Sequence, residues 1–141
     1  MFKRVHSPED LRQVFMVRAI VFMEEQGIPY ALELDEHDST ALHILGVVDG
    51  EPVACGRVRY TGDGAIFQRL AIRRAWRGQG LGNRLLGFML EESRKNGFHS
   101  FSLHAQTQAQ GFYARNGFTV CGEEFMEAGI PHVRMRLVDI L

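Results

Sequence analysis

The chain has 141 residues, of which 45% are hydrophobic and 23% are charged, and its formal net charge at pH 7 is −1. This length predicts one domain, residues 1–141, that buries its own core without metal or disulfide staples, and the near-neutral charge gives no general attraction to nucleic acid or membranes. The two cysteines form no metal-type cluster, and the sequence has neither an apolar membrane span nor a signal peptide after Met1, so we expect a cytoplasmic protein.

The first predicted elements are a short strand and a helix. Residues 2–6 alternate as a strand, and Ser7-Pro8-Glu9-Asp10 combines a helix N-cap, proline at the first helical position and acids in the first turn. Apolar residues then follow at helical spacing, namely Leu11, Val14, Phe15, Val21 and Phe22. Arg18 lies on the same face, where we favour a paired structural arginine over a charge that faces a substrate cleft.

An acidic segment separates this helix from the next strands. The stretch 24–29 breaks the helix, and the chain to Thr40 has little periodicity, which indicates a loop with at most a short helical turn. Its acids are Glu33, Asp35, Glu36 and Asp38. Two interpretations remain open from the sequence, a solvated face and a rim that attracts a cationic amine.

The rest of the chain alternates between strands and helices. Strands are predicted at 41–48, 52–60, 65–72, 98–104, 118–125 and 132–138, with turns at Asp49-Gly50 and at 126–131. Helices are predicted after residue 80 up to Asn96-Gly97, and at 107–115. The order β-α-loop-βββ-α-β-α-ββ predicts an α/β (α+β) fold, in which one mixed central sheet has helices on both faces.

The stretch Arg77-Gly78-Gln79-Gly80-Leu81-Gly82 connects a strand to the start of a helix. Glycines allow the backbone to bend and a ligand to come close, because no Cβ is in the way. The first N–H groups of a helix have no intrahelical partner, and the helix dipole adds partial positive charge there. The stretch therefore predicts a phosphate site, with Arg77 as its full positive charge.

Spacing restricts the type of phosphate ligand. No P-loop string is present, and a dinucleotide fingerprint that starts at Gly78 or Gly80 would end on Asn83 or Leu85 instead of glycine. What remains is Arg-x-x-Gly-x-Gly, filled by Arg77, Gly80 and Gly82. This pattern resembles the pyrophosphate loop of the GNAT superfamily of N-acetyltransferases, which implies acetyl-CoA as the cofactor.

A second motif strengthens the resemblance. The string 112–118, Phe-Tyr-Ala-Arg-Asn-Gly-Phe, resembles the F-Y-x-x-x-G-F signature of GNAT enzymes, and it falls on the expected helix and strand. The predicted element order also matches the GNAT-like acyl-CoA N-acyltransferase fold along the whole chain. Further strings resemble the small bacterial YjcF- and ElaA-like subgroup, namely Val17-Arg18, Val21-Phe22, Glu25-Gln26, 105–108 and 129–132.

The resemblance implies acetyl transfer from the CoA thioester to a primary amine, and it implies roles for several residues. The strand backbone at Leu70, Ala71 and Ile72 would hold the pantetheine arm and face the thioester oxygen, and Tyr113 would protonate the departing thiolate. The implied cofactor-binding residues further along the chain are Arg77, Gly78, Gln79, Gly80, Leu81, Gly82, Asn83, Phe112 and Arg115.

The general base is left open by the sequence. Many GNAT enzymes carry a glutamate on the strand where this chain has Gln68, and glutamine cannot take a proton at neutral pH. The remaining candidates are Glu25, His104, Glu127 and His132, of which His104 is placed with Tyr113 among the catalytic residues. The acceptor side is expected at Glu25, Gln26, Glu127 and His132, and we expect no metal.

Two other classes of function are weighed against this one. The first is a GNAT-fold module that binds CoA with little catalysis. Gln68 in place of the strand glutamate supports this alternative, whereas the presence of Tyr113 argues against it. A nucleic-acid binder would use the arginines at 57, 59, 69, 73, 74 and 77, but net charge is negative and no recognition motif is present. We expect a small-molecule or amino-group acceptor, no nucleic acid or membrane partner, and a monomer or homodimer.

Overall fold

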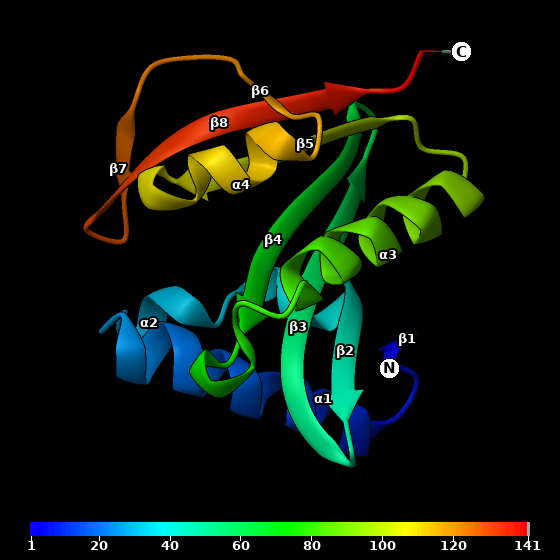
Figure 1. Ribbon diagram of the computed structural model, residues 1–141, viewed down its shortest axis with the longest axis vertical. Helices are drawn as coiled ribbons and strands as arrows, with labels where there is room; N and C mark the ends of the chain where they lie inside the picture. Colours follow the sequence, from blue (N-terminus) through cyan, green and yellow to red (C-terminus); the bar gives the residue numbers. More distant parts are fainter. Residues whose placement is uncertain (141) are drawn as a thin grey trace.

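One mixed β-sheet forms the centre of the molecule (Figure 1). The computed structural model of the protein describes residues 1–140, and within them eight strands pair in the order β1-β2-β3-β4-β5-β8-β6, with β7 also paired to β8. The strands are β1 (Phe2–Arg4), β2 (Leu42–Val48), β3 (Glu51–Thr61), β4 (Gly64–Ile72), β5 (Ser100–Gln106), β6 (Thr119–Val120), β7 (Phe125–Glu127) and β8 (Ile130–Val138). The predicted fold class and the order of elements are confirmed.

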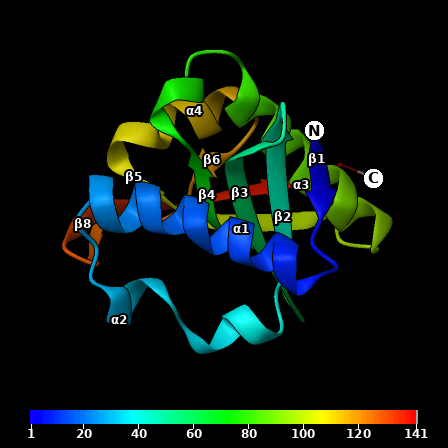
Figure 2. The ribbon, with the colours of Figure 1, turned by 90° about the horizontal axis from the view of Figure 1, so that it is seen from below.

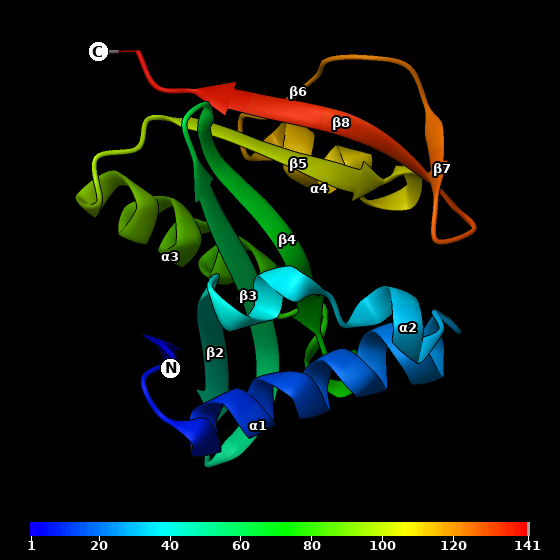
Figure 3. The same cartoon turned by 180° about the vertical axis from the view of Figure 1, so that it is seen from behind.

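Helices cover both faces of this sheet. They are α1 (Pro8–Arg18), α2 (Tyr30–Glu33), α3 (Leu81–Lys95) and α4 (Gln110–Arg115), with a π-helical segment at Ala19–Glu25 and 3-10 turns at Glu36–Ser39, Arg74–Trp76 and Thr107–Ala109. Figure 1 shows α3 and α4 in front of the sheet. Figure 3, seen from behind, shows α1 and α2 on the other face. Seen from below, α1 crosses the lower part of the sheet (Figure 2).

The start of α1 follows its sequence signals. Ser7 is extended and its hydroxyl accepts a hydrogen bond from the Asp10 N–H at 3.1 Å, with Pro8 in the first turn, as predicted. Val14 and Val17 of α1 pack on Leu45 and Cys55. A larger cluster lies under α3 and α4, built from Leu85, Leu86, Met89, Phe67, Phe101, Leu103 and their neighbours. The two clusters fix the sheet between its helix layers.

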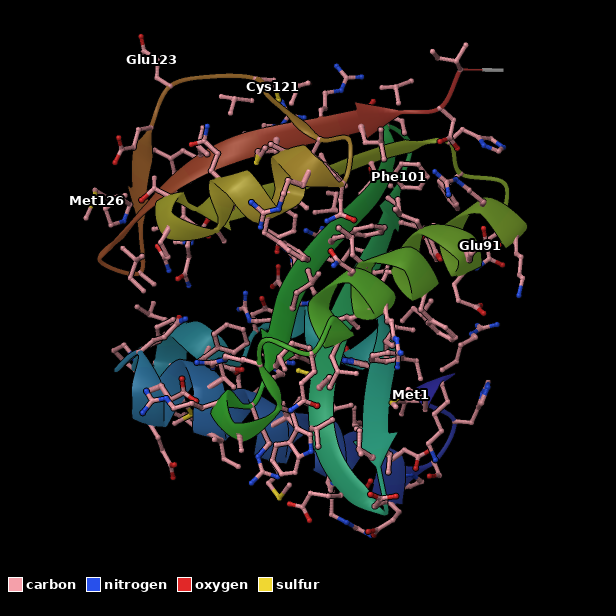
Figure 4. The ribbon with its side chains drawn as sticks, in the orientation of Figure 1. Met1, Glu91, Phe101, Cys121, Glu123 and Met126 are labelled. Atoms are coloured by element: carbon pink, nitrogen blue, oxygen red, sulfur yellow. The ribbon has the colours of Figure 1, made fainter. Side chains whose placement is uncertain are left out.

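Strands β4 and β5 are parallel but separate part-way along. Their pairing runs only from Ala65↔Phe101 to Phe67↔Leu103, and Figure 4 labels Phe101 where the two strands still run together. On its other side β4 carries a bulge, because its register with β3 shifts between Cys55 and Arg57, and Arg69 there has a φ of 57°. From Gln68 onward β4 therefore leaves one edge without a strand partner among the described residues.

The structure corrects several details of the sequence prediction. The first strand ends at Arg4, β5 begins at Ser100, and the predicted strand 118–125 is interrupted between β6 and β7. The final turn is tighter than predicted, because only Ala128 and Gly129, both with positive φ, separate β7 from β8. Within residues 1–140, no helix combines the length and apolar content that a membrane crossing requires.

Candidate active site

A cavity of about 760 Å³ fills the space where β4 and β5 diverge. It is lined by β4 from Ile66 to Ile72, by the end of β5, and by the π-helical segment, α4 and the β7–β8 hairpin. The residues predicted from the sequence that line it are Glu25, Gln26, Leu70, Ala71, Ile72, Arg77, Gly82, His104, Phe112, Tyr113, Glu127 and His132. The structure thus brings residues from distant parts of the chain to one cavity.

The glycine-rich turn stands at the edge of this cavity. Gly78 and Gly80 have φ of 77° and 80°, and Gly80 is the N-cap of α3. A Cβ built on either glycine would meet nothing within 4 Å, so the turn presents its backbone with open space beside it. Gly78, Gln79, Gly80, Leu81, Asn83 and Arg115 do not line the cavity itself. The Leu81 side chain packs in the core with Val53 and Ala54, which leaves only its backbone for a ligand.

The two sequence motifs meet in space. A Cβ on Gly82 would lie 3.3 Å from the Phe112 ring, so glycine permits α3 and α4 to approach closely here. Beside this contact, Asn116 Nδ2 donates a hydrogen bond to Asn83 Oδ1 at 3.0 Å and a second to the Phe112 carbonyl at 2.9 Å. Gly82 at the start of α3 and the aromatic pair of α4 therefore form one wall of the cavity.

Tyr113 lies in this wall between Phe112 and Phe118, with ring centroids 5.0 and 6.0 Å away. No group within residues 1–140 hydrogen-bonds the Tyr113 hydroxyl. Within those residues, the one side-chain nitrogen or oxygen that is fully enclosed and lacks a partner is His43 Nδ1, so the Tyr113 oxygen is not fully enclosed. The Tyr113 hydroxyl is therefore accessible, and the residue lines the cavity. Burial of the ring raises the pKa of Tyr113 to about 12, so the phenol keeps its proton at neutral pH.

His104, Glu127 and His132 form a second polar group in the cavity lining. His104 Nδ1 lies 2.9 Å from Glu127 Oε1, and His132 Nε2 lies 3.7 Å from Glu127 Oε2. A carboxylate accepts only, so His104 carries its proton on Nδ1 and, when neutral, leaves Nε2 as a proton acceptor. His132 Nδ1 donates to the Ile130 carbonyl at 2.7 Å, which fixes that ring, and Phe125 packs edge-on against His104.

Glu25 and Gln26 both line the cavity, but they pair with different partners. Arg77 Nη2 donates to Glu25 Oε2 at 2.8 Å, and Arg77 Nε donates to the Ile72 carbonyl at 2.8 Å. The Glu25 carboxylate therefore sits on the arginine predicted to bind phosphate. Gln26 instead pairs with Gln106 across the cavity, with Gln106 Nε2 donating to Gln26 Oε1 at 2.7 Å. This amide pair links the α1 side of the cleft to the end of β5.

Three of the four acids in the acidic segment, Glu33, Asp35 and Asp38, pair with arginines and form no free anionic rim, whereas Glu36 is exposed. Arg18 donates to Glu33 Oε1 at 2.5 Å and to Asp38 Oδ1 at 2.6 Å, as the preferred interpretation of a paired arginine predicted. Arg57 donates to Asp35 Oδ1 at 2.7 Å and Asp38 Oδ1 at 2.9 Å. We call Arg18, Arg57, Glu33, Asp35 and Asp38 the buried charge network. The carboxylates serve as counter-ions for arginines that the fold encloses.

The arginines considered as one cationic cluster therefore separate. Arg57 is fully buried in the charge network, Arg69 donates to the Glu33 carbonyl at 2.9 Å, and Arg73 pairs with Glu51 at 2.5 Å. Arg74 and Arg77 both lie toward Glu25, with Nη2 atoms 3.7 and 2.8 Å from its Oε2. These arginines therefore do not form one free cationic surface, because most of the guanidinium groups already have internal carboxylate or carbonyl partners.

Sequence reasoning missed several cavity residues. Gln68 is half-buried, and its Oε1 accepts hydrogen bonds from Arg57 Nε at 3.1 Å and Nη2 at 2.5 Å. Gln106 and Gln108 also line the cavity, and Gln108 Nε2 donates to Gln106 Oε1. The only sequence signal for these two was the string 105–108. Within residues 1–140, no group of His, Cys, Asp or Glu side chains is arranged to hold a metal ion.

Comparison with known proteins places this geometry in a family. A family profile described as "Acetyltransferase (GNAT) domain" matches residues 2–138. The N-acetyltransferase YjcF of Bacillus subtilis is 38% identical over 131 residues, which cover 92% of this chain and 93% of YjcF.

Solved structures agree with this match. Escherichia coli ElaA is 30% identical with a TM-score of 0.87, covering 97% of this chain and 98% of ElaA. An acyl-CoA N-acyltransferase from Pseudomonas aeruginosa is 28% identical with a TM-score of 0.88, covering 98% and 99% of the two chains. The profile spans nearly the whole chain, and YjcF and ElaA are the relatives that the sequence strings indicated.

Proposed function

The chain belongs to the GNAT acetyltransferase family and is an acyl-CoA N-acyltransferase. From this premise we propose that residues 1–141 act as one domain. We propose that this domain transfers the acetyl group of acetyl-CoA to a primary amine by direct attack of the amine on the thioester. The acceptor is a small molecule or an exposed amino group. The observation that carries the proposal is the convergence of the glycine turn, the unpaired edge of β4 and Tyr113 on one cavity.

Donor binding is assigned to the turn from Arg77 to Asn83. The first N–H groups of α3 and the open space beside Gly78 and Gly80 suit a diphosphate, and Arg77 adds a positive charge that it shares with Glu25. Phe112 lines the neighbouring wall and Arg115 stands at the end of α4. The residues present therefore fit the donor that the family uses.

The free edge of β4 is assigned two tasks. Backbone groups of Leu70, Ala71 and Ile72 would hold the pantetheine arm, and a backbone N–H directed at the thioester oxygen would stabilise negative charge that develops there. The bulge at Arg69 and the loss of pairing with β5 support this role, because they free backbone groups at the cavity. Side-chain identity on this strand matters little for either task.

Proton transfers are assigned to two groups of the cavity lining, His104 with its partners and Tyr113. His104 would accept a proton from the ammonium, since Glu127 holds the proton on Nδ1 and leaves Nε2 available. Glu127 and His132 would orient His104 and the amine. Tyr113 would donate the proton that the departing thiolate takes up. The two roles need two separate groups, and both His104 and Tyr113 line the cavity.

A matched pair of variants at Gly80 tests the proposal. Gly80→Asp and Gly80→Asn have nearly equal shape, and both residue types tolerate the left-handed backbone better than others do. An aspartate close to the diphosphate opposes it by about 4 kcal/mol at 4 Å in a medium of effective dielectric constant ~20. We expect calorimetry to show CoA affinity lowered ~100-fold or more by Gly80→Asp, and much less by Gly80→Asn.

Turnover with a panel of amines completes the test. Acetylation by the wild-type chain, lost with Gly80→Asp, would support the proposal. Equal CoA affinity in both variants and in the wild type would remove the assignment of the turn. Tight CoA binding with no acetylation of any amine would favour the CoA-binding module with little catalysis that the Gln68 substitution suggested.

A further inference from the structure

Arg18 and Arg69 hold helix α2 in place through hydrogen bonds to Glu33. Glu33 at its end is 2% exposed, and its side chain accepts hydrogen bonds from Arg18 at 2.5 and 2.9 Å. The Glu33 carbonyl accepts from Arg18 Nη2 at 2.8 Å and from Arg69 Nη2 at 2.9 Å. A four-residue helix has no stability of its own in water, so these contacts fix its position. The side chains of α2 are thereby presented in one arrangement.

This anchored helix exposes large apolar side chains beside the cavity. Tyr30 is 66% exposed and Leu32 is 55% exposed, although Leu32 also lines the cavity. Val21, Phe22 and Ile28 continue the same apolar wall. Exposed apolar surface on a fixed segment next to a cavity is typical of a binding surface. Figures 1 and 3 both show α2 and β7 on the same side of the molecule, and Leu32 of α2 and Glu127 of β7 both line the cavity.

The charges around this end of the cavity are almost all satisfied. Three carboxylates line the cavity, at Glu25, Glu33 and Glu127. Glu25 is paired with Arg77 and Glu33 with Arg18, whereas the ion partners of Glu127 within the described chain are His104 and His132. Only Glu127 therefore lacks a permanent cationic partner. The cavity has a place for one ammonium group, opposite an apolar wall.

We infer that the acceptor is a monoamine whose amino group is attached to an apolar alkyl or aryl body. The ammonium is received by Glu127 and His104, and the body lies against Leu32 and Ile28. A polyamine would place a second ammonium against the apolar wall, where it loses hydration without gaining a counter-ion. This inference rests on the proposed function, and it names the substrate class of the same site.

A series of amines measures the contribution of the apolar wall. Each methylene that reaches the wall should raise kcat/KM about 4-fold, the equivalent of ~0.8 kcal/mol per buried CH₂. We expect the ratio to increase from ethylamine through butylamine to hexylamine and phenethylamine, and spermidine to be a poor acceptor. Leu32→Ser should lower kcat/KM for hexylamine ~10-fold and change that for ethylamine less than ~2-fold. Val138→Ser, a similarly exposed residue at the end of β8, is the matched control and should change neither.

Several outcomes would overturn the inference. Spermidine preferred over hexylamine, or equal losses for both alkylamines in Leu32→Ser, would mean that the wall does not select the acceptor. If Leu32→Ser changed the oligomeric state measured by sedimentation and left the amine kinetics unchanged, the exposed apolar side chains of α2 would belong to an interface between two copies of the chain.

Binding measurements separate this inference from the proposed function. Titration of hexylamine and spermidine into the protein saturated with CoA reports recognition without turnover. Selective binding of hexylamine without acetylation of any amine would contradict the proposed function and keep the inference. Equal or weaker binding of hexylamine, with spermidine acetylated, would contradict the inference and keep the proposed function.

Discussion

Two groups of polar side chains lie close to the same cleft, and they differ in how completely they are paired. In the buried charge network, Arg57 alone donates to Asp35, Asp38 and Gln68. In the cavity walls, the Tyr113 hydroxyl has no hydrogen-bond partner within residues 1–140 and His104 uses one ring nitrogen on Glu127. Groups with all their partners inside the fold stabilise it, while groups with unused capacity at a cavity are available to a ligand.

The shifts in pKa follow the same difference. Burial alone would raise the pKa of Asp38, but hydrogen bonds from Arg18 and Arg57 outweigh it and hold the pKa of Asp38 well below its ordinary value. Tyr113 has no such partner, so burial is the cause that raises its pKa. In the buried charge network, neighbouring arginines keep the Asp38 carboxylate ionised. At the cavity, Tyr113 has no charged partner, and burial keeps its phenol protonated.

The largest effect that separates the two regions is expected for Asp38→Asn. This change keeps the shape but removes the charge that Arg18 and Arg57 share, leaving buried guanidinium groups without full compensation. We expect the free energy of unfolding to fall by about 3–5 kcal/mol, as is typical when one partner of a buried ion pair is removed. Denaturant unfolding measures it, with Glu36→Gln as the control, since Glu36 is exposed and its nearest ion partner is His37 at 3.7 Å.

The acid limb of stability gives a second measurement of the same network. The pKa of Asp38 is lower in the folded than in the unfolded chain, so its contribution is present above the unfolded value of ~3.9 and is lost as pH falls through the folded value. Asp38→Asn should therefore flatten the loss of stability below pH ~4. A variant as stable as the wild type, or with the same acid limb, would show that the network does not stabilise the fold.

The sequence predicted the fold because its signals are local. Ser7, the Asp49-Gly50 turn and the glycine at the end of α3 each determine an element boundary through a few neighbouring residues. The interruption between β6 and β7 was missed, since Gly122 and the acids after it form a loop that periodicity does not reveal. The bulge at Arg69 was also missed, because an arginine with positive φ is imposed by tertiary contacts.

The site could be predicted only as a set of residues. The motifs identified Arg77, Gly82, Phe112 and Tyr113, which the structure brings to one cavity. No sequence pattern shows that Glu25 would contact Arg77, since the two are 52 positions apart. Pairing across the fold also decided the role of Glu33, Asp35 and Asp38 in the acidic segment, whose charges are neutralised by arginines that come from α1 and β3. Roles in catalysis and binding stay predictions, and the variants below address them.

Tyr113→Phe probes the cavity side of the comparison. The ring and its packing on Phe112 and Phe118 are kept, and only an accessible hydroxyl is lost. We expect kcat to fall by about 10²–10⁴-fold if departure of the thiolate limits the rate, with CoA affinity and stability nearly unchanged. Steady-state kinetics and calorimetry measure the two quantities.

The pH profile sharpens this prediction. With a pKa raised to about 12, the wild-type tyrosine stays protonated through pH 10, so this group should cause no loss of kcat between pH 8 and 10. Wild-type kcat in Tyr113→Phe would make Tyr113 a packing residue. A large loss of stability instead of activity would place Tyr113 on the structural side of the comparison.

Arg77→Met should have an intermediate effect, on CoA affinity alone. Arg77 is partly exposed, and its pair with Glu25 is open to solvent, so its removal should change the free energy of unfolding by less than ~0.5 kcal/mol. One lost charge-assisted contact to phosphate should lower CoA affinity about 10–100-fold. Titration with CoA tests this, and Arg12→Met is the control, because Arg12 pairs only with Glu9 on the surface of α1. Unchanged affinity would exclude Arg77 from the phosphate site.

The smallest effect is expected for Glu25→Gln, and its sign decides what the Glu25–Arg77 pair does. If the carboxylate competes with phosphate for Arg77, its removal should raise CoA affinity about 3–5-fold, the magnitude typical of a partly exposed ion pair. If Glu25 instead orients Arg77 for phosphate, affinity should fall. We expect the first result, because the carboxylate occupies the guanidinium edge that phosphate needs. Repeating the titration in Arg77→Met should abolish the gain, since the two groups act on each other. A gain that persists there would mean that Glu25 acts on CoA through its charge alone.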